Sequence, residues 1–237
     1  MKKQNEKCSV VLLLHYVKLG LRSLLFLVML VFYILDRTDV LATFYPLLNL
    51  VWIFFVADML LRFFPSKFES MGCQKQFRRN YRPTKPDAKP VNQSWKTTAL
   101  VAGIWIALNA LFGVLYFLGI IDKGILILIC LAYSVCDIIC ILFFCPFQAW
   151  FMKNRCCTTC RIYNWDFAMM FTPLIFMPGV YYYSLLGCAL ILLLRWEIAY
   201  RMHPERFSDA TNACLKCSAC ETKLCRHKRR IHTKTDA

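Results

Sequence analysis

Long apolar runs alternate with short basic segments along this 237-residue chain. The hydrocarbon core of a bilayer is about 30 Å thick and takes roughly 20 apolar residues of helix per crossing, because each backbone polar group must bond within its own segment. The chain has at least five runs of that kind, and hydrophobic residues make up 59% of it against 18% charged. The pattern predicts an all-α, polytopic transmembrane helix bundle.

Hydropathy also predicts the domain boundaries. We expect a cytosolic or interfacial amino terminus over 1–18, a transmembrane domain over 19–200, and a basic, Cys-rich cytosolic tail over 201–237. The first run carries Lys18 and Arg22 and has no small-residue cleavage site before Asp36, so it is interpreted as a retained helix and not a signal peptide. The predicted spans are 19–35, 40–61, 97–120, 125–147, 163–178 and 180–200, with a basic loop at 62–96 and a cysteine loop at 148–162.

The last two spans come from one continuous apolar run between Tyr163 and Tyr200. Aromatic residues prefer the two membrane interfaces, and here they form three groups about 17 residues apart, or roughly 25 Å of helix. Pro178-Gly179 lies just before the middle group and favours a turn. We therefore predict a hairpin and six spans; five spans with an external tail is the alternative.

The basic residues predict the orientation. With six spans, only Arg37 and Lys123 of the 29 Lys and Arg residues lie outside, so the positive-inside tendency places both termini in the cytosol of a multi-pass cell-membrane protein. The net charge of +15 then suits a bilayer with anionic headgroups, which attract basic residues by about 1 kcal/mol each. Nucleic acid is not an expected partner.

Fourteen cysteines are the main chemical signal, and the dense clusters fall in segments assigned to the cytosol, where thiols stay reduced. Two residues between cysteines let a tight turn bring both thiolates to one metal site. A C-x2-C pair at Cys157 and Cys160 lies in the cysteine loop, and the hairpin brings that loop to the side of the tail. We expect a composite thiolate site, or a tail-only site, among the candidate ligands Cys157, Cys160, Cys214, Cys217, Cys220 and Cys225. A thiol redox role without metal, and inert or palmitoylated thiols, are the alternatives.

Two cofactors fit these cysteines equally well. Zinc takes closed sites of four cysteines, or three with a histidine such as His227 or His232. An iron–sulfur cluster also takes four thiolates, and the tail's C-x2-C-x2-C resembles the ferredoxin run. The resemblance is partial. The ferredoxin run continues with three residues and a Cys-Pro pair, whereas here four residues separate Cys220 from Cys225 and Arg226 follows. A Cys-Pro pair does occur at Cys145, after Cys140, and is similar to motifs of membrane-bound ferredoxin-like electron-transfer proteins.

Polar residues within the predicted spans form a second group of candidates. Ionisable groups at membrane depth cost a few kcal/mol unless they are paired or hydrated. We expect Asp58 to pair with Arg62 at i+4, and Asp137 and Asn109 to face the helix bundle. Convergence of Asp137, Asn109 and Asp58 on one cavity would indicate a small transporter or channel.

The sequence leaves the enzyme class open, since it has no P-loop, G-x-S-x-G, H-E-x-x-H or G-x-G-x-x-G motif. The leading hypothesis is an integral membrane protein with a cytosolic cysteine-thiolate metal site, used for electron transfer or for redox or metal sensing. The alternatives are the transporter or channel, and a non-enzymatic membrane anchor or assembly factor whose tail binds a protein partner.

Overall fold

A computed structural model describes residues 10–35, 45–65, 71–85, 87–91, 94–154, 156–216 and 218. Those residues form helices and connecting segments, and the only β pairing among them is an isolated bridge between Pro83 and Asn212. The predicted all-α class is therefore confirmed.

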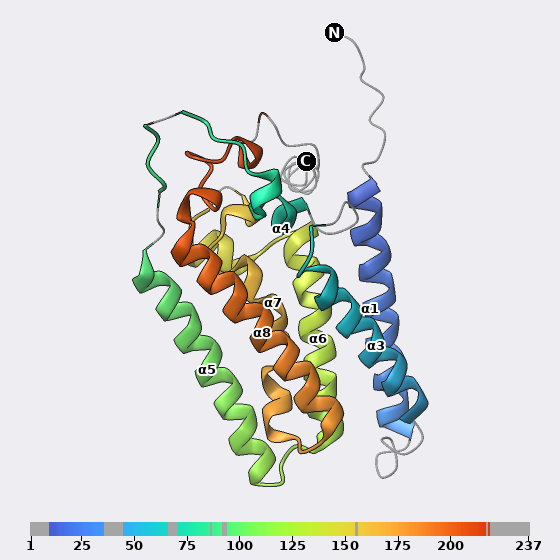
Figure 1. Ribbon diagram of the computed structural model, residues 1–237. Helices are drawn as coiled ribbons and strands as arrows, with labels where there is room; N and C mark the ends of the chain where they lie inside the picture. The colour runs from blue at the N-terminus through green and yellow to red at the C-terminus, as the bar shows by residue number, and fades with distance from the viewer. Residues whose placement is uncertain are drawn as a thin grey trace, which may run out of the picture.

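Figure 1 shows the helices packed side by side in a bundle. Within the described residues, four helices are long and apolar enough to cross a membrane: α1 (Val10–Leu35), α5 (Trp95–Phe117), α6 (Lys123–Leu142) and α8 (Val180–Met202). A fifth apolar helix, α3 (Tyr45–Leu61), is shorter at 17 residues. The first helix begins at Val10, well before the expected Leu19, so Lys18 and Arg22 lie inside a helix and not at its entrance.

Helices α1 and α6 lie antiparallel. At one end the rings of Tyr16 and Phe143 are 6.2 Å apart, and at the other the Tyr33 hydroxyl donates to Asp122 Oδ2 at 2.8 Å. Asp122 also caps α6, because its Oδ1 accepts from the Ile125 N–H at 3.0 Å. The amino end of α1 therefore lies beside the carboxyl end of α6.

The predicted fifth span is a broken helix. Its pieces are a 3-10 turn (Tyr163–Trp165), α7 (Asp166–Phe171) and a second 3-10 segment (Thr172–Phe176). The break has a local cause, because Pro173 has no N–H to donate to the preceding turn, and the Thr172 hydroxyl donates to the Ala168 carbonyl at 2.7 Å. The chain then turns through Pro178-Gly179 into α8, and the broken segment packs along α8 as the arm of a hairpin.

Helix α5 approaches this broken segment closely. Trp105 Nε1 donates to Thr172 Oγ1 at 3.2 Å, and a Cβ added at Gly113 would lie 2.4 Å from Phe176 Cζ. Because Gly113 has no side chain, the Phe176 ring can pack directly against α5.

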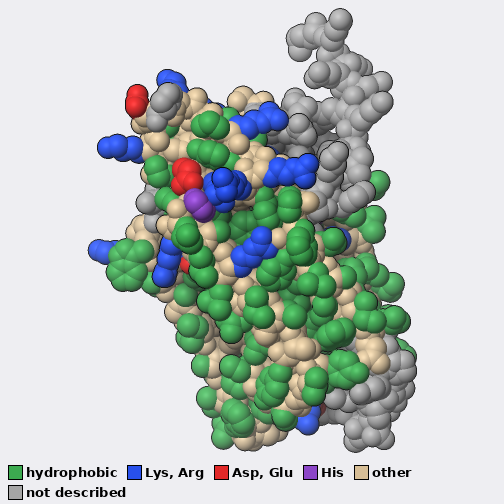
Figure 2. All heavy atoms as spheres, in the orientation of Figure 1, with side chains coloured by type: hydrophobic (Ala, Val, Ile, Leu, Met, Phe, Trp, Pro, Cys, Tyr) green, Lys and Arg blue, Asp and Glu red, His purple; other side chains and the backbone are tan. Residues whose placement is uncertain are grey.

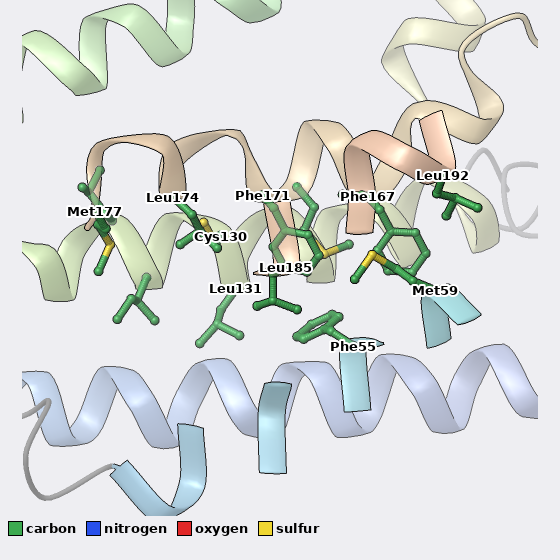
Figure 3. Close-up of a cluster of buried hydrophobic side chains, with 14 of the residues drawn as sticks. Phe55, Met59, Cys130, Leu131, Phe167, Phe171, Leu174, Met177, Leu185 and Leu192 are labelled. Carbon is green, nitrogen blue, oxygen red and sulfur yellow. The ribbon is translucent and has the colours of Figure 1, made fainter. Parts of the chain in front are cut away.

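The core lies on the facing surfaces of α3, α6, the broken segment and α8. Figure 3 shows Phe55 of α3, Leu131 of α6, Phe171 of α7 and Leu185 of α8 facing one another. All four are buried. The apolar contact surface thus lies on helices from both halves of the chain.

One end of the bundle is polar. There the basic loop, which includes α4 (Met71–Gln76), meets the cysteine loop and the described part of the tail: Gln76 Nε2 donates to the Thr158 carbonyl at 2.8 Å, and Asn212 Nδ2 donates to the Lys75 carbonyl at 3.0 Å. Figure 2 shows charged side chains gathered at this end, while the rest of the visible surface is mostly apolar. The distribution is that of a membrane protein with one strongly basic face.

Candidate functional site

An ion-pair network joins α1, α3 and α6 inside the bundle. Arg22 of α1 is 1% exposed; its Nη2 lies 3.1 Å from Asp58 Oδ2 of α3, and its Nη1 lies 3.1 Å from Asp137 Oδ2 of α6. Nη1 also donates to the Ser134 carbonyl at 2.9 Å. Lys18, one turn earlier on α1, contacts Asp58 Oδ1 at 2.6 Å. Two cations therefore balance two carboxylates.

The partners found for Asp58 are Lys18 and Arg22 of α1, and its pairing with Arg62 stays a prediction. Arg62 Nη1 lies 2.5 Å from Asp166 Oδ2 of α7, and its guanidinium lies 4.5 Å from the centre of the Phe167 ring. A local i+4 pairing is worth only about 0.5 kcal/mol, whereas removing one partner of a buried ion pair costs about 3–5 kcal/mol, so the contacts between helices dominate at these residues.

Asp137 and Asn109 both face inward, as predicted, but into different surroundings. Asp137 bonds Arg22, whereas Asn109, 2% exposed, donates through Nδ2 to the Trp105 carbonyl of its own helix at 2.9 Å. Among the described residues no hydrogen bond links Asn109 to Asp58 or Asp137. The convergence required for a transporter site is therefore limited to the two aspartates, and Arg22 already binds both.

A cavity of about 150 Å³ lies beside this network. Its wall holds four thiols from two separate segments, which we call the cysteine pocket: Cys140, Cys145, Cys157 and Cys160. The exposed Cys136 also contributes to the wall, together with Asp137 of the ion-pair network and Asp166, the partner of Arg62. The cavity is thus the place where cysteines of the loop and acids of the bundle meet.

The chain folds locally to bring these thiols together. Helix α6 ends at Leu142, three residues before Cys145, and a π-helical turn follows at Phe147–Phe151. Gln148 in that turn connects the two segments: its N–H donates to Cys145 Sγ at 3.4 Å, and its Oε1 accepts from the Cys157 thiol at 2.7 Å. The side chains of Cys140 and Cys145 also hydrogen-bond each other.

Cys160 is the most buried of the four. It lies at the end of the 3-10 turn Cys157–Thr159, and burial raises the pKa of its thiol from 9.0 to about 11. The next residue, Arg161, forms two hydrogen bonds with Glu197 of α8 and lies over the Tyr200 ring at 3.9 Å. The loop that carries Cys157 and Cys160 is therefore anchored to α8.

Two buried polar atoms on the wall of the cavity have no hydrogen-bond partner among the described residues. They are the Tyr133 hydroxyl and Asp166 Oδ1. The cavity wall therefore carries a hydroxyl and a carboxylate oxygen that no described protein group engages.

Only part of the predicted ligand set can be located. Cys157 and Cys160 lie in the cysteine pocket, while the Cys214 thiol donates to the Asn80 carbonyl at 3.1 Å and does not line the pocket. Cys217, Cys220 and Cys225 lie outside the described residues, so the composite and tail-only sites stay predictions. Across the described part of the chain, no three or more His, Cys, Asp or Glu side chains are arranged to hold a single metal ion.

No known protein family, curated protein or solved structure matches this chain. Its function must therefore be argued from the chemistry of the site. The residues missed as site members in the sequence are Cys140 and Cys145, for which C-x4-C-P was the available signal, and Gln148, for which there was none.

Proposed function

We propose that this chain is a six-span membrane protein that carries an iron–sulfur cluster in the cysteine pocket and transfers electrons through it. The observation that carries the proposal is the meeting of four thiols, from the end of α6 and from the cysteine loop, around one cavity. Clusters of both common types take four cysteine ligands.

The size of the cavity favours a cluster over zinc. A tetrahedral zinc site needs its sulfurs roughly 3.8 Å apart around one point, and the described residues contain no such grouping. The cavity of about 150 Å³ matches one that holds benzene in another protein, so it accepts a core of several atoms. A cluster separates its ligands more widely than one ion does, and a cavity of this volume has room for its core.

The polar groups around the pocket fit a sulfur-bound cofactor. The Gln148 N–H already donates to Cys145 Sγ, and the Tyr133 hydroxyl is a donor available to a second sulfur. Hydrogen bonds to cluster sulfurs stabilise the negative charge and set the reduction potential. When bound, the cluster would supply one-electron transfer, while these residues hold it and tune it.

Charge balance is the other requirement, because thiolates and carboxylates repel one another. Asp137 and Asp166 both line the cavity, and each is neutralised by an arginine on its far side, Arg22 and Arg62 respectively. These two ion pairs thereby allow both carboxylates to lie next to an anionic cofactor.

The decisive experiment is anaerobic purification followed by visible absorption, electron paramagnetic resonance and iron and sulfide analysis. We expect cluster absorption in the wild type, loss of most of it in Cys145→Ser and in Cys157→Ser, and retention in Cys188→Ser, whose residue lies on α8 away from the pocket. A colourless protein after reconstitution with iron and sulfide, or unchanged absorption in Cys145→Ser, would overturn the proposal. Zinc bound without colour would support the zinc interpretation instead.

A matched variant distinguishes a cluster bound in the cysteine pocket from one bound by the tail. Replacing Cys217 and Cys220 by Ser together should leave the pocket's absorption intact. If the tail variant loses the cluster and the pocket variants keep it, the tail-only site is the correct one.

The six-span topology has its own test. The hairpin turns the chain back to the basic face, and α1 begins at that same end of the bundle beside the end of α6. We therefore expect reporter fusions after Lys7 and after Asp236 both to report the cytosol. Reporters on opposite sides of the membrane would contradict six spans and support the five-span alternative.

A further inference from the structure

A second, larger cavity lies next to the cysteine pocket along the same helices. It measures about 430 Å³ and is enclosed by α3, α6, the broken segment and α8. Tyr133 on α6 lines the cysteine pocket and Cys130, one turn away or roughly 5 Å along the helix, lines the second cavity. On α7 the consecutive residues Met170 and Phe171 divide between the two cavities in the same way.

The lining of this cavity is aromatic as well as apolar. Phe55 and Phe171 meet edge to face at 5.2 Å between ring centres, and Trp52 and Tyr181 do so at 6.1 Å. Figure 3 shows Phe55 and Phe171 with the aliphatic side chains of Leu131 and Leu185 around them. Such rings stack on a planar ligand, whereas an acyl chain offers no ring to stack.

A few polar groups interrupt this apolar wall. Asn49 and Tyr182 line it, and the Trp52 indole N–H donates to Ser184 Oγ at 2.7 Å beside it. Apolar pockets with a few placed donors are typical sites for small organic ligands. An amide and a phenol suit the two carbonyl oxygens of a ring.

We propose that this cavity binds the ring of an isoprenoid quinone, the lipid-soluble electron carrier that the cysteine pocket would reduce. The inference rests on the proposed function for its redox step but not for binding. In that step the two ring carbonyls become hydroxyls. A cluster held by the cysteine pocket would supply two electrons one at a time, solvent water would supply the two protons, and a soluble one-electron carrier at the basic face would replace the electrons.

Binding is tested with decylubiquinone as the probe, titrated against the full-length protein in detergent micelles and followed by tryptophan fluorescence. Leu174→Trp places a large side chain in the cavity and should abolish saturable binding, while the control Leu190→Trp, at a residue of α8 that is 51% exposed, should leave it unchanged. Asn49→Leu, which needs no extra space, should weaken binding about tenfold through one lost hydrogen bond.

The outcomes separate this inference from the cluster. Saturable binding that persists in Cys145→Ser supports the quinone site whether or not the cluster exists. Absence of binding in a wild-type protein that shows cluster absorption overturns the quinone site alone. The quinone site is also overturned if Leu174→Trp and Asn49→Leu bind decylubiquinone like the wild type. A phospholipid that mass spectrometry finds bound to the protein and that decylubiquinone does not displace would overturn it too.

Discussion

Arg22→Met is the most informative single change in the membrane domain. It removes a cation of 1% exposure that contacts aspartates on two other helices, and methionine preserves much of its apolar stem. Asp58 keeps Lys18 at 2.6 Å, but Asp137 loses its only ion-pair partner among the described residues. The variant thus leaves one partly buried carboxylate without a counter-charge.

Two independent estimates give the size of the effect. Removing one partner of a buried ion pair costs about 3–5 kcal/mol, and placing an aspartate at the centre of a membrane helix costs roughly 2.5–3.5 kcal/mol. We therefore expect Arg22→Met to lower the free energy of unfolding by about 3 kcal/mol. Lys18→Met, on the same helix but with its partner still bound by Arg22, should cost about 1 kcal/mol.

Unfolding in mixed micelles titrated with SDS measures both variants. The double variant Arg22→Met/Asp137→Asn removes the uncompensated charge and should regain about 2 kcal/mol relative to Arg22→Met. A cost for Arg22→Met no greater than that for Lys18→Met would refute the reasoning. So would strict additivity of the Arg22 and Asp137 changes.

Four further predictions concern the loop and the bundle. In the metal-free protein, alkylation of Cys160 should accelerate with pH through about 11 and not through 9.0, because burial favours the neutral thiol; mass spectrometry of labelled peptides gives the profile. By the same linkage, the Cys160 contribution to stability is fully present below pH 9.0 and is lost as the pH rises through about 11, so Cys160→Ser should flatten the unfolding free energy over that range. Gly113→Ala should destabilise by about 1–3 kcal/mol through the clash with Phe176, whereas Gly103→Ala on the same helix, where nothing lies within 4 Å, should stabilise by up to about 1 kcal/mol. Arg161→Lys should loosen the cysteine loop by about 2 kcal/mol, because lysine cannot make the paired hydrogen bonds to Glu197, and proteolysis of the loop at matched temperature would show it.

The sequence predicted the parts of the fold that depend on local hydropathy. Apolar length indicated α5 and α6 to within about five residues, because lipid selects each helix separately, whereas α8 also needed the spacing of the aromatic groups. The turn at Pro178-Gly179 followed from backbone restrictions that need no partner. The break at Thr172-Pro173 was visible as a proline but not as the 3-10 segment that follows it.

The site was less accessible to sequence reasoning because its contacts join distant segments. Arg22 and Asp137 are 115 positions apart, and no periodicity connects them. Asp58 had an obvious partner one turn away, but its contacts with Lys18 and Arg22 of α1 could not be predicted from spacing. Cys157 and Cys160 were predicted as ligands, whereas Cys140 and Cys145 became neighbours of that pair only through the end of α6 and the π-helical turn.

The separation of these ion-pair partners also sets an order of events during synthesis. At about 5–20 residues per second, Asp58 leaves the ribosome roughly 2–7 s after Arg22, and Asp137 follows Arg22 by roughly 6–23 s. Helices α1 and α3 can therefore associate early through Lys18, Arg22 and Asp58, as a pair with one excess positive charge. We expect that pair to stay near the insertion machinery or the lipid headgroups until α6 is made. Asp137 of α6 then neutralises the excess charge, and α1 can move fully into the bilayer.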